Sequence, residues 1–206
     1  MIQTVFNRYK TVLVLTTALI LSACTTKTQL SGTPEENWQS RQVELQAITS
    51  FQVNGSLAYL SDKTKQYARF FVSQTSVSDY EIKLTTPLGS TVMTLVSKPN
   101  MAWAIDKDGN QFSGANMEQI LYQLTEMNIP LTSLHQWLIG LSNNPEQDQL
   151  DSSGRLRQTQ FSQDGVNWQL KIDRYMSSNK NLSLPAQLEL MHRDEIIRLK
   201  MNSWTL

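Results

Sequence analysis

The chain has 206 residues, of which 40% are apolar and 17% are charged, and its 18 basic residues balance 18 acidic ones. This length suits a single domain with its own core, and a neutral chain without blocks of like charge lacks the basic surface of a nucleic-acid-binding protein. One Cys and two His exclude both a disulfide scaffold and a closed four-ligand zinc site.

The first 23 residues have the zones of a secretory signal peptide. Arg8 and Lys10 precede an apolar run over residues 11–21. That run is too short for a membrane-spanning helix, which needs about 20 mostly apolar residues. We therefore predict a signal peptide at residues 1–23, which is removed from the mature chain.

The signal ends in Leu21-Ser22-Ala23-Cys24, which resembles the lipobox of bacterial lipoproteins. In a lipobox the Cys receives a diacylglyceryl group, so we expect lipid at Cys24; an ordinary signal peptide that happens to end at a Cys is the alternative. The next residue is Thr25 and not the Asp that often retains such lipoproteins in the inner membrane. The resemblance therefore implies a lipid anchor in the outer membrane, on its periplasmic face.

After Cys24 the sequence predicts a tether and then one folded domain. Residues 24–33 are polar and without periodicity, as in a flexible tether. The folded domain is expected over residues 34–206. Thr33, Pro34 and Glu36 form a helix-start pattern, which predicts a helix over residues 34–49 with Trp38, Leu45 and Ile48 facing the core.

From residue 51 the apolar residues alternate with polar ones, which indicates strands. Asp108-Gly109 and Asp164-Gly165 are two-residue hairpin signals. The expected strands are 51–59, 67–74, 79–85, 90–97, 101–106, 111–112, 156–162, 166–172, 184–192 and 195–203.

Two short helices are expected between these groups of strands. Apolar residues recur at helical spacing from Met117 to Leu124, Pro130 interrupts the pattern, and it resumes over residues 131–141. The predicted fold class is α+β, an antiparallel sheet with helices on one side.

Enzyme motifs are absent from the sequence. The P-loop, the Gly-x-Ser-x-Gly nucleophile turn, the His-Glu-x-x-His zinc motif and the dinucleotide glycine pattern are all missing. His135 and His192 have no evident partner and are interpreted as structural histidines. We expect no enzyme activity, no catalytic residue, no metal and no cofactor.

The segment Thr85-Thr86-Pro87-Leu88-Gly89-Ser90 has the Pro and Gly of a type II or related turn, but it places a large apolar residue, Leu88, at its tip. From composition alone we expect Leu88 to fold back onto the body. The alternative is an exposed apolar probe that touches lipid or an acyl chain.

Several separated strings make the chain resemble the LolB family of bacterial lipoprotein receptors over nearly all of its mature length. They are Tyr67-Ala-Arg-Phe-Phe71, Thr86-Pro-Leu-Gly-Ser90, Ile129-Pro-Leu131, Leu134 with Gln136-Trp137 and Gly140-Leu141, Asn167-Trp168, and Arg198-Leu-Lys-Met201 with Trp204.

The resemblance implies an incomplete, strongly curved antiparallel β-barrel with helices that form a lid over an apolar cavity. It implies a monomeric receptor that takes acylated lipoproteins from the periplasmic carrier LolA and releases them into outer-membrane phospholipid, without nucleotide hydrolysis and without nucleic acid. It also implies that the loop of Pro87, Leu88 and Gly89 targets lipid, which reverses the expectation of a tucked-in Leu88.

Alternation along the strands suggests which side chains line the cavity, with Arg69, Glu81, Lys83, Lys171, Arg198 and Lys200 pointing out. A plain packed core is the alternative for every inward residue. The candidates for the acyl cavity and its lid are Phe70, Val72, Ile82, Leu84, Ile120, Leu124, Trp137, Leu170, Ile172, Ile197 and Leu199, and Ala68 is also expected to point in.

Two other functions remain open at this stage. The chain can be a structural or assembly lipoprotein of the outer membrane that binds protein partners only. It can also be a lipid-modifying enzyme, although the absence of a recognisable nucleophile and base counts against that interpretation.

Overall fold

The computed structural model describes residues 32–206. The predicted signal peptide, the lipid site at Cys24 and nearly all of the tether lie outside the described residues. Within them, no helix is long and apolar enough to cross a membrane.

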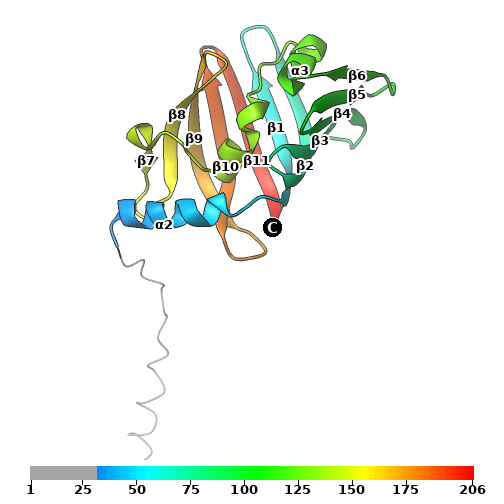
Figure 1. The fold of residues 1–206 in the computed structure, drawn as a ribbon. Helices are drawn as coiled ribbons and strands as arrows, with labels where there is room; N and C mark the ends of the chain where they lie inside the picture. The colour runs from blue at the N-terminus through cyan, green and yellow to red at the C-terminus, as the bar shows by residue number, and fades with distance from the viewer. Residues whose placement is uncertain (1–31) are drawn as a thin grey trace, which may run out of the picture. The chain divides into compact units, whose positions relative to one another are not determined.

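One antiparallel sheet of eleven strands forms the body of the domain, in the order β6-β5-β4-β3-β2-β1-β11-β10-β9-β8-β7 (Figure 1). The first and last long strands of the chain, β1 and β11, pair in the middle, so both halves of the sequence share one sheet. The strands are β1 (Phe51–Leu60), β2 (Lys65–Ser76), β3 (Asp79–Thr85), β4 (Thr91–Lys98), β5 (Met101–Asp106), β6 (Gln111–Gly114), β7 (Gln149–Leu150), β8 (Leu156–Gln163), β9 (Val166–Ser177), β10 (Ser183–His192) and β11 (Glu195–Thr205).

The described helices are α2 (Pro34–Gln46), α3 (Met117–Thr125) and α4 (Leu134–Ile139), with short 3₁₀ turns η1 (Leu131–Ser133) and η2 (Pro145–Gln147). The α+β class and the order of strands and helices are therefore confirmed. The strong curvature of the sheet stays a prediction.

Local signals in the sequence explain where elements begin and turn. The Thr33 hydroxyl accepts from the Glu36 amide, and the Glu36 carboxylate accepts from the Thr33 amide, so the predicted capping box starts α2. Asp164 and Gly165 have φ of 52° and 77°, as the tight turn between β8 and β9 requires.

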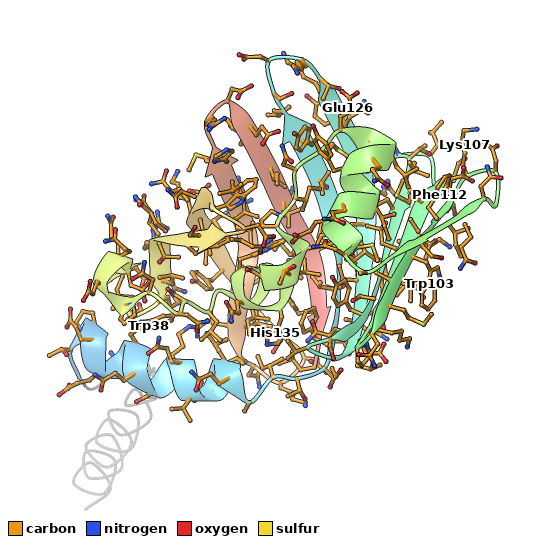
Figure 2. All side chains as sticks on the ribbon, turned by 45° about the horizontal axis from the view of Figure 1, so that its top comes forward. Trp38, Trp103, Lys107, Phe112, Glu126 and His135 are labelled. Atoms are coloured by element: carbon orange, nitrogen blue, oxygen red, sulfur yellow. The ribbon has the colours of Figure 1, made fainter. Side chains whose placement is uncertain are left out.

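Strand β7 was not predicted, and several predicted boundaries were wrong: β2 begins at Lys65 and not at residue 67, and β9 continues to Ser177 and not to residue 172. Two further differences have a clear local cause. Helix α2 ends at Gln46, because the chain must turn at Ala47 to enter β1, although Ile48 is still buried. The β5–β6 hairpin has a loop of residues 107–110 and not two residues, because the Asp106 carboxylate accepts from the amides of Asp108 and Asn110. Lys107 lies at the tip of this hairpin (Figure 2).

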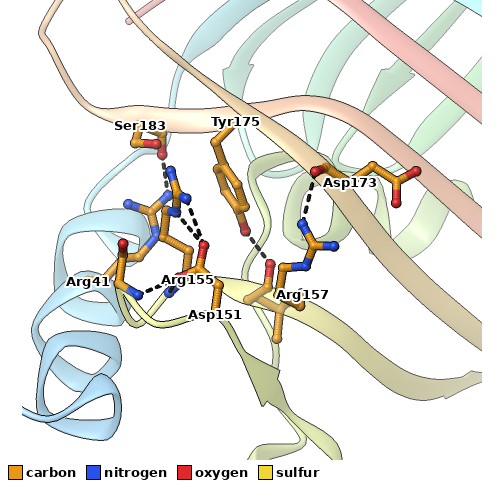
Figure 3. Close-up of polar contacts among 9 residues, drawn as sticks. Arg41, Asp151, Arg155, Arg157, Asp173, Tyr175 and Ser183 are labelled. Carbon is orange, nitrogen blue, oxygen red and sulfur yellow. Dashed lines mark hydrogen bonds and ion pairs between the residues drawn. The ribbon is translucent and has the colours of Figure 1, made fainter.

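Helix α2 is fixed to the β7–β10 side of the sheet by an aromatic and cationic contact (Figure 3). The guanidinium groups of Arg41 and Arg155 lie 5.3 and 4.8 Å from the centre of the Tyr175 ring. Arg41 donates to the Ser183 carbonyl, Asp151 pairs with Arg155 at 2.7 Å, and the Tyr175 hydroxyl donates to a backbone carbonyl. These contacts hold the helix that directly follows the predicted tether.

Candidate functional site

The described part of the chain encloses an apolar cavity between the sheet and the segment of residues 117–139, which we call the lid. The lid consists of α3, η1, α4 and their connections; α3 packs against β4, β5 and β6, and α4 packs against β10. The cavity is lined by Leu57, Phe70, Val72, Ile82, Leu84, Leu95, Leu121, Ile129, Leu131, Leu134, Trp137, Leu138, Ile197 and Leu199.

Seven of the eleven candidate residues lie around this cavity. Six of them lie on strands β2, β3 and β11, which turn every second side chain to the same face, and the seventh lies on α4. The seven residues are Phe70, Val72, Ile82, Leu84, Trp137, Ile197 and Leu199. Their contact with acyl chains stays a prediction.

The other four candidates lie elsewhere in the core. Leu170 and Ile172 are fully buried: Leu170 lines a separate pocket of about 280 Å³ beside α4, and Ile172 packs under Gly140. Ile120 is buried against Gly114, and Leu124 is half-buried on α3.

Half of the lining residues were not predicted from the sequence as cavity residues. Leu95 belongs to the alternating pattern of β4, and Leu131, Leu134 and Leu138 recur at helical spacing, so their burial was visible in the sequence. Which of them face the cavity depends on how the lid crosses the sheet, and no local pattern contains that information.

The cavity is small in this conformation. Its volume of about 40 Å³ admits roughly three water-sized molecules. A long acyl chain has more than a dozen carbons, each of them comparable to a water molecule in size. The lining is therefore suited to hydrocarbon, but the space in this conformation is too small for a long acyl chain.

A polar latch holds the lid to β8. Thr132 donates its amide to Glu118 at 2.6 Å, and Gln163 of β8 donates to the same carboxylate oxygen. The Gln163 side-chain oxygen in turn accepts from the amide and the hydroxyl of Ser133, at 3.0 and 2.6 Å. Burial raises the pKa of Glu118, and these hydrogen bonds oppose that shift.

The loop between α3 and η1 is held to the middle of the sheet. Asn128 donates to Glu195 of β11 at 2.9 Å, and the Tyr59 hydroxyl donates to the same carboxylate at 2.5 Å. Burial and the Glu195 carboxylate both raise the pKa of Tyr59. Inside the lid, the Trp137 indole donates to the Pro130 carbonyl at 2.9 Å, so this cavity residue has its polar atom satisfied.

His135 lies in the interior of the domain (Figure 2). Its Nδ1 is 2.7 Å from the side-chain nitrogen of Gln74, and its ring stacks on Phe51 at 6.0 Å. Burial lowers the pKa of His135. His192 contacts the Asn167 carbonyl at 2.8 Å. Residues 32–206 contain no group of three or more His, Cys, Asp or Glu able to hold a metal ion.

Leu88 projects into solvent and is 97% exposed. The Gly89 amide donates to the Thr86 carbonyl at 2.9 Å, and the Thr86 amide donates to the Ser90 carbonyl at 2.8 Å. Gly89, and not Leu88, has the positive φ of 95°, so the turn is not type II; it is closed by a left-handed Gly after Leu88. The expectation that Leu88 folds back onto the body was wrong.

Comparison with known proteins adds to this geometry. The family model "Outer membrane lipoprotein LolB" matches residues 49–204. Outer-membrane lipoprotein LolB of Photorhabdus laumondii is 39% identical over 194 residues, which covers 93% of this chain and 92% of that protein. LolB of Yersinia pestis is 38% identical over 192 residues, which covers 92% of each.

Among solved structures, a LolA-superfamily protein from Nitrosomonas europaea has a similar fold. It superposes with a TM-score of 0.54 at 12% identity, covering 85% of this chain and 94% of that one. The chain thus shares the overall fold of that protein.

Proposed function

Because this chain belongs to the LolB family of outer-membrane lipoproteins, which are non-enzymatic receptors of the Lol lipoprotein-localisation pathway, we propose that it takes acylated lipoproteins from the periplasmic carrier LolA and inserts their acyl chains into the inner leaflet of the outer membrane. The protein acts as a monomer that is anchored by lipid at Cys24. It needs no nucleotide and no cofactor.

The physical problem is the cost of exposing acyl chains to water. Each methylene contributes about 0.8 kcal/mol, so three long chains cost tens of kcal/mol in gross terms. A direct passage from one apolar cavity to another avoids that cost. The direction of transfer follows from relative affinity: the receptor binds the acyl chains better than the carrier does, and a bilayer holds them better still.

The single observation that carries the proposal is the wholly apolar cavity under a lid that is held by polar contacts at its rim. The hydrogen bonds of Glu118, Gln163 and Ser133 can be replaced by bonds to water when the lid moves. The apolar side chains below the lid form no such bonds with water, so their exposure when the lid moves is unfavourable and favours the binding of an apolar ligand. Acyl chains are such a ligand.

The turn of Pro87, Leu88 and Gly89 delivers the acyl chains to lipid. An exposed Leu side chain gains about 1.5–3 kcal/mol when it leaves water for an apolar phase. Backbone hydrogen bonds on both sides of Leu88 already fix the turn. Insertion of this side chain into lipid therefore costs little additional conformational entropy of the backbone. Leu88 therefore brings the domain close to the bilayer surface during release.

The test uses the lipidated chain reconstituted in phospholipid vesicles and a soluble LolA–lipoprotein complex. Flotation of the vesicles then separates inserted lipoprotein from lipoprotein still on the carrier. We expect the lipoprotein to float only with vesicles that contain the receptor. A folded receptor that leaves all lipoprotein on the carrier refutes the proposal and favours an assembly lipoprotein that binds protein partners only.

A further inference from the structure

We propose that basic side chains on the outer face of the sheet, next to the Leu88 turn, bind the anionic headgroups of the phospholipid surface and set the tilt of the domain on the membrane. We call Lys65, Arg69, Lys83 and Lys200 the basic collar. The inference rests on the proposed function, because it concerns how the same receptor meets the bilayer.

The strand register places the collar beside the turn. Arg69 on β2 pairs with Thr85, the last residue of β3 before the Leu88 turn. On its other side Arg69 pairs with Ser56 of β1, and Ser56 pairs with Lys200 of β11. Arg69 and Lys200 thus share one cross-strand row, about 10 Å apart at a strand spacing of about 4.8 Å.

Exposure shows that this row faces away from the cavity. On β2, Phe70 and Val72 are buried under the lid, whereas Lys65, Arg69 and their neighbours in alternation are exposed. Lys83 pairs with Phe71, one row further from the turn. The inward residues of these strands line the cavity, so the collar lies on the opposite face of the sheet.

The collar carries uncompensated charge. Five ion pairs occur within residues 32–206, and none of them includes a collar residue. Arg198, which neighbours Lys200 on the same face, pairs with Glu189 at 2.5 Å. Glu81 lies on the same face of β3, but further from the Leu88 turn. The strand residues of this face nearest to Leu88 are therefore basic, and the acidic Asp62 and Asp194 at this end lie in the β1–β2 and β10–β11 turns.

Two exposed aromatic side chains lie among the collar residues. Tyr67 is 63% exposed and Phe71 is 38% exposed, and both share the outer face of β2 with Arg69. Aromatic residues beside cations are typical of surfaces that rest at a membrane–water interface, where the ring enters the headgroup layer and the charge meets phosphate.

The dimensions agree with simultaneous contact. Leu88 follows Thr85 by three residues, so its side chain reaches up to about 10 Å beyond the Arg69 row. The headgroup layer of one leaflet is about 5–8 Å thick. When Leu88 enters the hydrocarbon, the row of Arg69 and Lys200 therefore lies at the depth of the lipid phosphates.

Without the predicted signal peptide, which contains Arg8 and Lys10 and no acidic residue, the chain has 16 basic and 18 acidic residues, so the collar does not replace the lipid anchor. Its role is to orient a domain that is already tethered. Anionic phospholipid is the occupant that fits positive charge, interfacial aromatics and an apolar tip on one surface.

The experiment uses the full lipidated receptor in phosphatidylcholine vesicles with and without phosphatidylglycerol. A fluorophore is attached at Ser56→Cys, in the middle of the collar, and quenched by lipids with a nitroxide in the headgroup. A second label at Asn143→Cys, exposed after α4 on the lid side, is the reference. We expect quenching at residue 56 to exceed that at residue 143 only when phosphatidylglycerol is present.

Charge reversal tests the collar directly. Lys65→Glu with Arg69→Glu is expected to reduce quenching at residue 56 to the reference level, as is high salt. Lys180→Glu, an exposed cation in the β9–β10 connection, is the control and should leave quenching unchanged. Quenching at residue 56 that is equal in neutral vesicles, or that survives charge reversal, overturns the inference.

Transfer of lipoprotein is measured in the same vesicles. Transfer without collar quenching refutes this inference and leaves the proposed function intact. Quenching without any transfer refutes the proposed function alone.

Discussion

The side-chain nitrogen of Gln74 on β2 lies 2.7 Å from Nδ1 of His135 on α4, and this pair joins the lid to the sheet in the interior of the domain. The same Gln74 nitrogen donates to the Thr49 carbonyl at 2.9 Å. Nδ1 of His135 is therefore the acceptor, and the neutral ring is the form that fits this site.

Stability is expected to fall in mild acid because of His135. Its folded-state pKa lies below the value of about 6.5 that is usual for histidine. The unfolded chain therefore binds more protons below about pH 6.5, so the contribution of His135 is complete above that pH and is lost as the pH falls. Urea unfolding at about pH 7.5 and about pH 5.5 measures the loss. The His135→Gln variant has no titrating group at this position, so its free energy of unfolding should fall less between these two pH values than that of the wild type. An equal fall would contradict the assignment of the pH dependence to His135.

A side chain at Gly55 is expected to destabilise the centre of the sheet. A Cβ at this position would lie 2.1 Å from the Lys200 carbonyl oxygen and 2.9 Å from the Phe70 ring. The register of β1 against β11 shifts here, so Gly55 permits a close approach of backbone. Gly55→Ala should cost about 2–3 kcal/mol in the free energy of unfolding. Ser56→Ala, next in sequence and exposed, should change it by less than about 0.5 kcal/mol.

Loss of the polar latch is expected to open the lid. Gln163→Ala removes a donor to Glu118 and the acceptor for Ser133. We expect faster binding of a fluorescent long-chain fatty acid and a loss of about 1–2 kcal/mol of stability. Gln160→Ala is the matched control, because Gln160 is exposed on the same strand and its side chain makes no lid contact. Unchanged binding by a folded Gln163→Ala protein would show that the latch does not limit access.

The sequence predicted the sheet well because its signals are local. Alternation defined β3 and β5 to the residue, and Asp164-Gly165 marked a tight hairpin. The pairing of β1 with β11 joins residues about 150 apart, and no short pattern encodes it. For the same reason Leu170 and Ile172 were expected in the cavity: alternation gives the face of a strand, but not which part of that face the lid covers.

The turn shows a different limit. Composition predicted a buried Leu88, because a lone apolar residue is usually covered. The backbone hydrogen bonds between Thr86 and Ser90 instead hold it 97% exposed. The resemblance to the LolB family indicated that Leu88 is exposed. The hydrophobic free energy of a single Leu side chain, considered alone, predicted that it is buried.

The most direct test of the central claim follows a lipoprotein from LolA to vesicles through the receptor with Leu88→Glu. Val77→Glu is the matched control, because Val77 is 55% exposed in the turn between β2 and β3, at the opposite end of these strands. We predict that Leu88→Glu still removes lipoprotein from the carrier, detected by cross-linking, but that little of it floats with the lipid, and that Val77→Glu delivers normally. Full delivery by folded Leu88→Glu protein would contradict the account.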